Sequence, residues 1–280
     1  MMRRSFTLKN SSEELIRGDL RHREDVKDAP TIIICHGFKG FKDWGFFPVT
    51  AESLAEAGYV AVTFNFSRNG IGSDLQNFTE LDQFAINTYS HELDDLNCVT
   101  EAIIAGELGK GLIDIEKIGL LGHSRGGGLA LIFASNEDRI KTLVTWSAIA
   151  TVERYSEEEI KLWEKNGYIE IENRRTKQLM RIHLDLLNDI RKNKNKLNIL
   201  KSVKNLEIPT LIIHGDMDES VPADEANEIY NNLGATSKDL ILIEGGLHTF
   251  GTSHPMEAKT ASFDTVLDLT ENWFDRYLNI

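Results

Sequence analysis

The sequence predicts an α/β fold built around a mostly parallel sheet, and two observations lead to this class. Short apolar runs rich in β-branched residues alternate along the chain with longer segments whose apolar residues recur at helical spacing. The short runs are apolar throughout, as strands are when helices cover both faces of their sheet. A chain of 280 residues with 41% hydrophobic residues can form a deep core, and we expect a single domain over residues 1–280.

The expected strands begin with an antiparallel hairpin. Residues 3–9 and 12–20 alternate apolar and polar side chains on either side of Asn10-Ser11-Ser12, which is typical of two strands joined by a turn. Six apolar runs follow and predict the remaining strands: Thr31–Cys35, Tyr59–Phe66, Lys117–Leu121, Ile140–Trp146, Thr210–Ile213 and Leu240–Ile243.

Helical segments lie between these runs. Glycine marks the end of two of them, since Gly58 and Gly234 directly follow the last residues of the helical pattern. The expected helices are Val49–Ala57, Ala85–Ala105, Gly127–Ser135, Ala223–Leu233 and Lys259–Leu278.

Residues 151–205 interrupt the alternation because they carry no strand pattern. They hold 13 basic and nine acidic side chains, and ten of the basic ones fall between Arg174 and Lys204. Ser156 followed by three glutamates predicts a helix N-terminus. We expect a helical insertion after the sixth strand. Two interpretations stay open: a solvated helix pair, or a lid whose underside forms an acyl pocket and whose charge attracts an anionic substrate.

Composition limits the expected partners and compartment. The chain has 31 Lys and Arg against 44 Asp and Glu, a net charge of −13, whereas nucleic-acid binders show a basic footprint. Cys35 and Cys98 alone cannot form a disulfide framework, which suits a reducing compartment. No run approaches the roughly 18 apolar residues of a membrane span, and the polar residues 5–10 are unlike a signal peptide. We therefore expect a cytoplasmic protein that binds neither nucleic acid nor membranes, as a monomer or a homodimer.

The motif Gly122-His123-Ser124-Arg125-Gly126 is the strongest chemical signal. It follows an expected strand and precedes a helix of small residues, the setting of a G-x-S-x-G nucleophile elbow. The central residue of such a turn takes a strained backbone conformation, and glycine neighbours avoid collision. We predict that Ser124 is a nucleophile. The alternatives are an incidental serine in a glycine-rich turn and a phosphate-binding loop, although the Gly-Lys-[Ser/Thr] ending of such a loop is missing.

A serine nucleophile needs a base and an orienting carboxylate, which in this kind of sheet follow in the order acid, then histidine. Asp216, Asp218 and Glu219 all lie in the turn after Thr210–Ile213. We favour Asp218 as the acid, because Asp216 follows Gly215 directly and can brace the turn, whereas Asp218 lies deeper in the loop and can reach a histidine.

His248 is the expected base because it lies on the glycine-rich loop after Leu240–Ile243. His254, which precedes Pro255, is its competitor. The other histidines are expected to brace backbone or to pack: His22, His36, His91, His123, His183 and His214. Since no histidine pair has ligand spacing on a helix, we expect neither a metal site nor a cofactor.

Two backbone N–H groups are expected to form an oxyanion hole. Arg125 follows the nucleophile and supplies one. Phe38, in the His36-Gly37-Phe38 turn after Thr31–Cys35, is the candidate for the second, and an ordinary strand-to-loop turn is the alternative.

The GHSRGG elbow, the HGF turn, the HGDMDESVP turn and the GGLHTF loop, in this order over residues 30–278, resemble the α/β-hydrolase superfamily. The HGFKG and GHSRGG motifs are similar to bacterial cinnamoyl and feruloyl esterases and to dienelactone-hydrolase-like enzymes, a group related to the catalytic domain of prolyl oligopeptidases. The resemblance implies an eight-stranded central sheet, a triad carried onto Ser124, Asp218 and His248, and a cap at 151–205. One position departs from it. Bacterial esterases usually have Gln or Met where this chain has Arg125, whose guanidinium we expect to bind either an anionic substrate or a carboxylate of the lid.

These residues predict a serine hydrolase that cleaves small-molecule esters of small or aromatic acyl groups through an acyl-enzyme. An acyl-CoA thioesterase or acyltransferase is the main alternative, because basic residues of the insertion and Arg125 suit the phosphates of coenzyme A. A prolyl-oligopeptidase-like peptidase and a non-catalytic binder are less favoured. The chain has no room for a propeller, and no member of the expected triad is missing.

Overall fold

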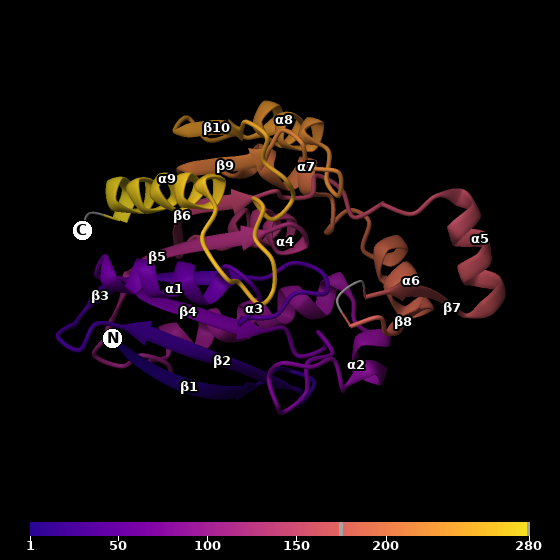
Figure 1. Cartoon of the computed structure of the whole chain (residues 1–280), viewed down its shortest axis with the longest axis horizontal. Coiled ribbons are helices and arrows are strands. Elements are labelled where there is room, and N and C mark those ends of the chain that lie inside the picture. The colour runs from indigo at the N-terminus through magenta and orange to yellow at the C-terminus, as the bar shows by residue number, and fades with distance from the viewer. Residues whose placement is uncertain (174–175, 279–280) are drawn as a thin grey trace.

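A sheet of eight strands forms the centre of the molecule in the computed structural model, which describes residues 1–173 and 176–278 (Figure 1). Across the sheet, the strand order is β1-β2-β4-β3-β5-β6-β9-β10. In chain order the strands are β1 (Met2–Lys9), β2 (Leu15–His22), β3 (Ala29–Cys35), β4 (Val60–Asn65), β5 (Ile113–His123), β6 (Ile140–Trp146), β9 (Thr210–Gly215) and β10 (Lys238–Ile243).

The sheet is mostly parallel, which confirms the predicted fold class. Its antiparallel part is the expected opening hairpin, in which β1 pairs with β2, and the pairing of β2 with β4. The pairs from β4 through β3, β5, β6 and β9 to β10 are all parallel. Each apolar run of the sequence corresponds to one of these strands. β5 extends beyond the expected Lys117–Leu121 at both ends, and β4 is one residue shorter at each end than the expected Tyr59–Phe66.

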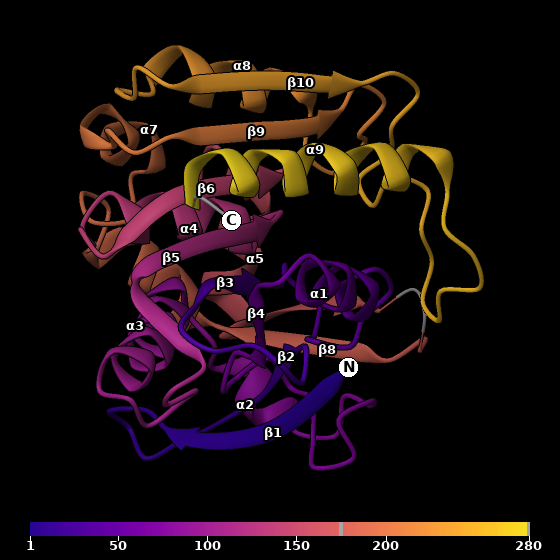
Figure 2. The same cartoon turned by 90° about the vertical axis from the view of Figure 1, so that its left-hand side faces the viewer.

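Helices cover both faces of the sheet. α1 (Phe47–Glu56) and α9 (Ala261–Leu278) lie on one face, and α3 (Tyr89–Ile104), α4 (Arg125–Ala134) and α8 (Ala223–Asn232) lie on the other (Figure 2). Within the described residues, no helix has the length and apolar character needed to cross a bilayer.

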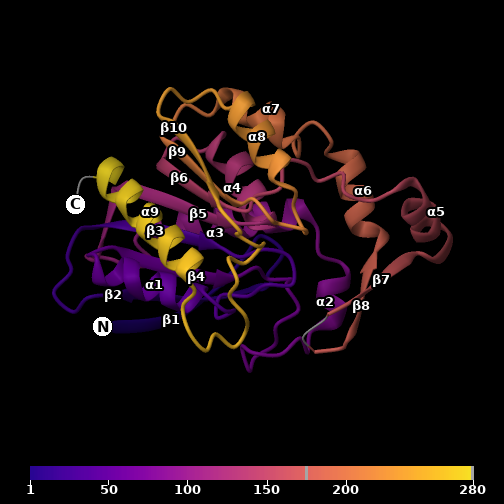
Figure 3. The same ribbon diagram turned by 45° about the horizontal axis from the view of Figure 1, so that its top comes forward.

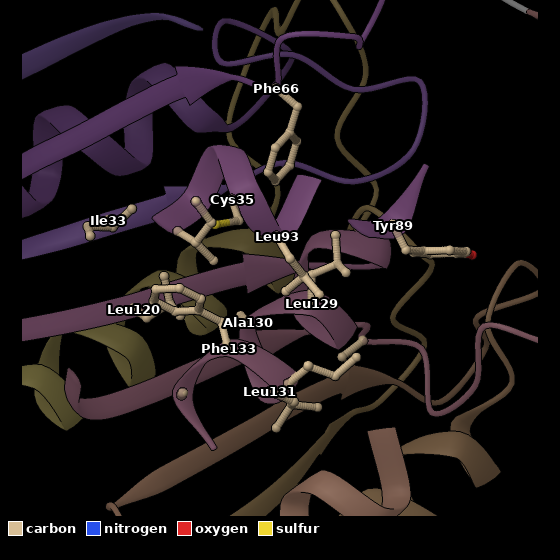
Figure 4. Packing of buried hydrophobic residues seen from close by; sticks show 14 of the residues in the cluster. Ile33, Cys35, Phe66, Tyr89, Leu93, Leu120, Leu129, Ala130, Leu131 and Phe133 are labelled. Atoms are coloured by element: carbon tan, nitrogen blue, oxygen red, sulfur yellow. The ribbon is translucent and has the colours of Figure 1, made fainter. Parts of the chain in front are cut away.

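Each face of the sheet has its own core because strand side chains alternate between faces. Ile32 and Ile34 of β3 are buried with residues of α1 and α9, whereas Ile33 and Cys35 are buried with residues of α3 and α4. Figure 4 shows the second core, where Leu129 of α4 lies among the side chains of this cluster. The apolar strand runs of the sequence are thus covered on both sides.

The single helix expected over Ala85–Ala105 was wrong, because the chain breaks there. A short helix, α2 (Leu81–Ala85), ends before Thr88, which is extended and starts α3 as its N-cap. The Thr88 hydroxyl accepts a hydrogen bond from the His91 N–H at 3.2 Å. A threonine in this capping position is a helix-start signal inside an otherwise continuous pattern.

The insertion after β6 is not wholly helical as expected, since it also contains a β-hairpin. Its elements are α5 (Glu157–Asn166), β7 (Tyr168–Glu172), β8 (Leu179–His183), α6 (Leu184–Lys192), α7 (Ile199–Ser202) and the 3-10 helix η1 (Val203–Asn205). The missed signal is a two-residue alternation in β8, where Met180 and Ile182 are buried between exposed neighbours. Ser156 does start α5, with reciprocal hydrogen bonds to Glu159.

The insertion projects from one end of the sheet, with β8 beside α2 (Figures 1 and 3). Of the ten basic residues expected between Arg174 and Lys204, Arg174 and Arg175 lie outside the described residues.

Candidate active site

Ser124 lies on a sharp turn between β5 and α4. Its backbone has φ 56° and ψ −120°, a left-handed conformation that a serine rarely adopts. A Cβ on Gly122 would lie 2.5 Å from the carbonyl oxygen of Gly126, and one on Gly126 would lie 2.4 Å from that of His36. The turn therefore requires glycine on both sides of the strained serine, as the motif predicts.

The structure brings Ser124, His248 and Asp218 into one line of hydrogen bonds. Ser124 Oγ lies 3.1 Å from His248 Nε2, and His248 Nδ1 lies 2.7 Å from Asp218 Oδ2. The three residues come from the loops after β5, β10 and β9, at the carboxyl ends of parallel strands in one sheet. In this geometry, the Nδ1–H donates to the carboxylate and Nε2 accepts from the serine hydroxyl.

Asp218 is held as a carboxylate inside its loop. Its Oδ1 accepts hydrogen bonds from the backbone N–H groups of Ser220 and Val221, at 2.8 and 2.9 Å. Burial by itself raises the pKa of the Asp218 carboxyl. Hydrogen bonds from His214 and His248 outweigh that effect, and the pKa lies well below its ordinary value. The other carboxylates of the turn, Asp216 and Glu219, are exposed and make no such contact.

His254, the competing base, lies elsewhere. Its Nδ1 accepts a hydrogen bond from the Gly45 N–H at 3.0 Å, and its ring stacks against Trp44. The histidines next to the site brace backbone. His123 Nε2 donates to the carbonyl oxygen of His248 at 3.0 Å, and burial, followed by the positive charge of His248, lowers the pKa of His123 to about 3. His123 therefore remains neutral and holds the loop that carries His248.

The two expected oxyanion donors lie beside the serine. A Cβ on Gly37 would lie 3.0 Å from Ser124 Cβ, so the turn that carries Phe38 passes within contact distance of the serine. Among the described residues, no acceptor takes the backbone N–H of Phe38 or of Arg125. Arg125 is the first residue of α4, where such N–H groups have no intrahelical partner. Both groups can thus donate to a developing oxyanion.

Within the described residues, the side chain of Arg125 does not reach a carboxylate of the insertion, which excludes one of its two predicted partners. Its Nε donates to Glu92 of α3 at 2.8 Å, and its guanidinium stacks on the ring of Tyr89 at 4.0 Å. Arg125 is 5% exposed, and its Nη2 has no hydrogen-bond partner. Sequence reasoning missed Glu92 and Tyr89, although their spacing of three places both on one side of the first turn of α3.

A cavity of about 360 Å³ opens beside Ser124 and His248. The remaining lining residues are Phe38, Lys39, Tyr89, Arg125, Ile149, Arg154, Tyr155, Ser220 and Val221. A larger hollow of about 610 Å³ lies between α3, the end of α4 and the residues around α7, away from this serine. Volume alone does not make the larger hollow the reaction site, because it contains none of the three hydrogen-bonded residues. In the part of the chain that the structure describes, no group of His, Cys, Asp and Glu is arranged to hold a metal ion.

Comparisons with known proteins agree with this architecture. A model of the prolyl oligopeptidase family matches residues 44–280. The uncharacterised peptidase YuxL of Bacillus subtilis (strain 168) is 25% identical over 232 residues, which cover 81% of this chain and 31% of that protein. An uncharacterised 31.7 kDa protein of Escherichia coli, from the traX-finO intergenic region, is 29% identical over 133 residues, or 48% of this chain and 40% of that protein. The chain thus spans less than half the length of the curated relatives it matches.

Solved structures show the same fold. Est1E from Butyrivibrio proteoclasticus, determined with ferulic acid bound, superposes with a TM-score of 0.76 and 19% identity, over 98% of this chain and 100% of that one. The α/β hydrolase GrgF from Penicillium sp. sh18 superposes with a TM-score of 0.76 and 16% identity, over the whole of both chains. The fold that the motifs predicted, an α/β-hydrolase fold, is confirmed.

Proposed function

This chain belongs to the prolyl oligopeptidase family of serine hydrolases, and from that premise we propose that it hydrolyses carboxylic esters of small molecules through an acyl-enzyme. The observation that carries the proposal is the line of hydrogen bonds from Ser124 through His248 to Asp218, which opens onto a cavity.

The first half of the reaction forms the acyl-enzyme. Ser124 Oγ attacks the ester carbonyl while His248 Nε2 takes the hydroxyl proton. Asp218 keeps the His248 ring in the required tautomer and stabilises the imidazolium. The oxyanion accepts hydrogen bonds from the backbone N–H groups of Phe38 and Arg125. The tetrahedral intermediate then expels the alcohol, which receives the proton from His248.

The second half releases the acid by the reverse roles. His248 takes a proton from water, the resulting hydroxide attacks the acyl carbonyl, and Ser124 leaves with the proton returned by His248. The shape and lining of the cavity favour small or aromatic acyl groups. About 360 Å³ holds only a small substrate part, and Phe38, Tyr89 and Tyr155 supply aromatic walls.

A peptidase is the second candidate function, because the family model carries the name of a peptidase family and one curated relative is named as a peptidase. An amide differs from an ester in its poorer leaving group, so the same residues can serve both reactions. The two candidates differ in which substrate turns over.

The test is turnover of a p-nitrophenyl ester series from acetate to octanoate, beside methyl ferulate, an acyl-CoA and a p-nitroanilide of a short peptide. We expect the short or aromatic esters to react and Ser124→Ala to lower kcat by about a millionfold. Ser135→Ala is the matched control, because it changes a serine at the other end of the same helix whose hydroxyl bonds only the carbonyl oxygen of Leu131. It keeps full activity.

Three results would contradict the ester proposal. Turnover of the anilide alone would make the protein a peptidase, and turnover of the acyl-CoA alone would make it a thioesterase. Ester hydrolysis that survives Ser124→Ala would remove this serine from the reaction.

A further inference from the structure

The cavity beside Ser124 is lined by positive charge, in a chain whose net charge is −13. Lys39, Arg125 and Arg154 all line it, and no carboxylate does among the described residues. The carboxylates that pair with the two arginines, Glu92 and Glu225, lie behind them and outside the lining. In both ion pairs the arginine, rather than the carboxylate, therefore lines the cavity.

The guanidinium of Arg125 has a hydrogen-bond donor that no acceptor takes among the described residues. Glu92 takes its Nε–H, and the rings of Tyr89 and Phe38 lie 4.0 and 5.3 Å from its guanidinium carbon. Its Nη2 has no partner although the side chain is almost fully buried. A guanidinium with a nitrogen left without an acceptor is incompletely satisfied, and the part of Arg125 that lines the cavity can still attract an anionic group.

Arg154, at the start of the insertion, also lines the cavity and is held in place. Its Nη1 donates to both carboxylate oxygens of Glu225, at 2.7 and 2.8 Å, and its Nη2 donates to the carbonyl oxygen of Ser220 at 3.1 Å. These contacts attach it to α8 and to the loop of Asp218. The side chain is thus held at the cavity wall before any ligand arrives.

The other polar side chains that the insertion and α3 contribute are also donors. Burial raises the pKa of the Tyr155 hydroxyl and of the Tyr89 hydroxyl, so both stay protonated through the physiological range. Lys39 lies at the edge of the insertion, with its Nζ 3.4 Å from the carbonyl oxygen of Glu172. The lining thus combines aromatic rings with hydroxyl and cationic donors.

We propose that the substrate of this cavity is an ester that carries a free carboxylate on a small or aromatic frame, with the carboxylate bound by Arg125 and Arg154. The inference rests on the proposed ester hydrolysis and adds the charge of the substrate to it. A carboxylate matches the planar fork of a guanidinium and accepts hydrogen bonds from tyrosines as well. The free carboxylate of the substrate belongs either to the acyl part or to the leaving alcohol.

Matched ester pairs test the inference and separate these two sources. On the acyl side, p-nitrophenyl hemiglutarate is compared with p-nitrophenyl hexanoate. On the alcohol side, 4-carboxyphenyl acetate is compared with 4-carbamoylphenyl acetate. We expect kcat/KM to be about ten- to a hundredfold higher for the charged member of one pair, the range that a charge-assisted hydrogen bond in a covered site supplies. The preference should fall as salt is raised.

Arg154→Gln tests the site itself, and we expect it to reduce the preference ratio at least fivefold. Arg139→Gln is the matched control, since Arg139 is likewise an ion-paired arginine, bound to Glu101 and Glu137, but lies outside the cavity. It keeps the preference. Should Arg154→Gln fail to fold, Arg154→Lys provides the second measurement, because lysine keeps the positive charge but lacks the planar fork that matches a carboxylate.

Failure of the inference is distinguishable from failure of the proposed function. Neutral esters that react as well as both charged ones would overturn the carboxylate site and leave the esterase intact. A preference unchanged in Arg154→Gln, or in Arg154→Lys if the first variant does not fold, would overturn it as well. No turnover of any ester would contradict the proposed function.

Discussion

The turn that carries Ser124, residues 122–126, and the insertion, residues 151–205, line the same cavity. They are held in place differently. The turn is held by backbone packed against backbone, since a Cβ on Gly122 or Gly126 would lie within 2.5 Å of a carbonyl oxygen. The insertion is attached to the sheet domain by side-chain contacts instead, and some of these contacts are hydrogen bonds. Asp189 of α6 accepts from the N–H and hydroxyl of Ser90 at 3.0 and 2.5 Å, and Gln178 donates to the carbonyl oxygen of Phe78.

The insertion is also anchored by an apolar side, with Trp163 and Met180 fully buried in the core that α4 shares. Most of its charged groups are exposed, although Asp189 is buried against Ser90. The proposed function then implies that close backbone contacts place Ser124, whereas the insertion completes the cavity with side chains that can be exchanged. Specificity can then vary on an unchanged reaction centre.

The largest expected effect comes from adding one methyl group to the turn. In Gly126→Ala the new Cβ meets the backbone oxygens of His36 and Cys35 at 2.4 and 2.7 Å, so α4 must move away from β3. We expect a loss of about 2–4 kcal/mol in the free energy of unfolding. We also expect at least a tenfold loss in kcat/KM, because Ser124 moves with the helix. Urea unfolding and ester kinetics measure the two effects. A variant with wild-type stability and rate would disprove the close-packing account.

A middle-sized effect is the pH dependence of a buried ion pair in the sheet domain, compared with an exposed pair in the insertion. Burial raises the pKa of Asp19 in β2, but hydrogen bonds from Arg3 and Lys42 outweigh burial and lower that pKa to about 2. A lowered folded-state pKa stabilises the protein above the unfolded value of 3.8, and the contribution is lost as the pH falls from 3.8 towards 2. It amounts to about 2 kcal/mol.

The measurement is urea unfolding of the wild type and Asp19→Asn between pH 6 and 2. The stability difference between them should shrink by about 2 kcal/mol across that window. Glu170→Gln is the control from the insertion, because Glu170 pairs with Arg181 at an exposed position, where such pairs contribute little at any pH. A difference between wild type and Asp19→Asn that stays constant to pH 2 would contradict the lowered pKa.

The strands and the turn could be predicted from the sequence because their signals are local. An apolar run such as Thr31–Cys35 indicates a buried strand, and a glycine on each side of Ser124 indicates a tight turn, without reference to the rest of the chain. The order of motifs along the chain also predicted which loops meet at the carboxyl end of the sheet, and the structure brings Asp218, rather than Asp216, to His248.

Contacts between distant segments could not be predicted in the same way. The partner of Arg125 is Glu92, 33 residues away on α3, and nothing in either sequence context distinguishes Glu92 from the many other acidic residues. The hairpin of β7 and β8 was missed because each strand is five residues long and lies among charged residues. A short alternating pattern among charged residues does not by itself predict a strand, because such a strand is stable only when it pairs with another.

The smallest expected effect comes from the same substitution made in the insertion. Gly167 ends α5 with φ 79°, and its N–H donates to the carbonyl oxygen of Trp163, yet a Cβ there would meet no atom within 4 Å. Gly167→Ala should therefore cost only the strain of a left-handed alanine, about 1 kcal/mol, and leave kcat/KM for a neutral ester unchanged. Comparing the two Gly→Ala variants separates backbone strain from packing. Gly167→Ala adds backbone strain alone, whereas Gly126→Ala adds a steric collision. If Gly167→Ala destabilised the protein as much as Gly126→Ala, the insertion would be as tightly packed as the turn, and the proposed division between them would be wrong.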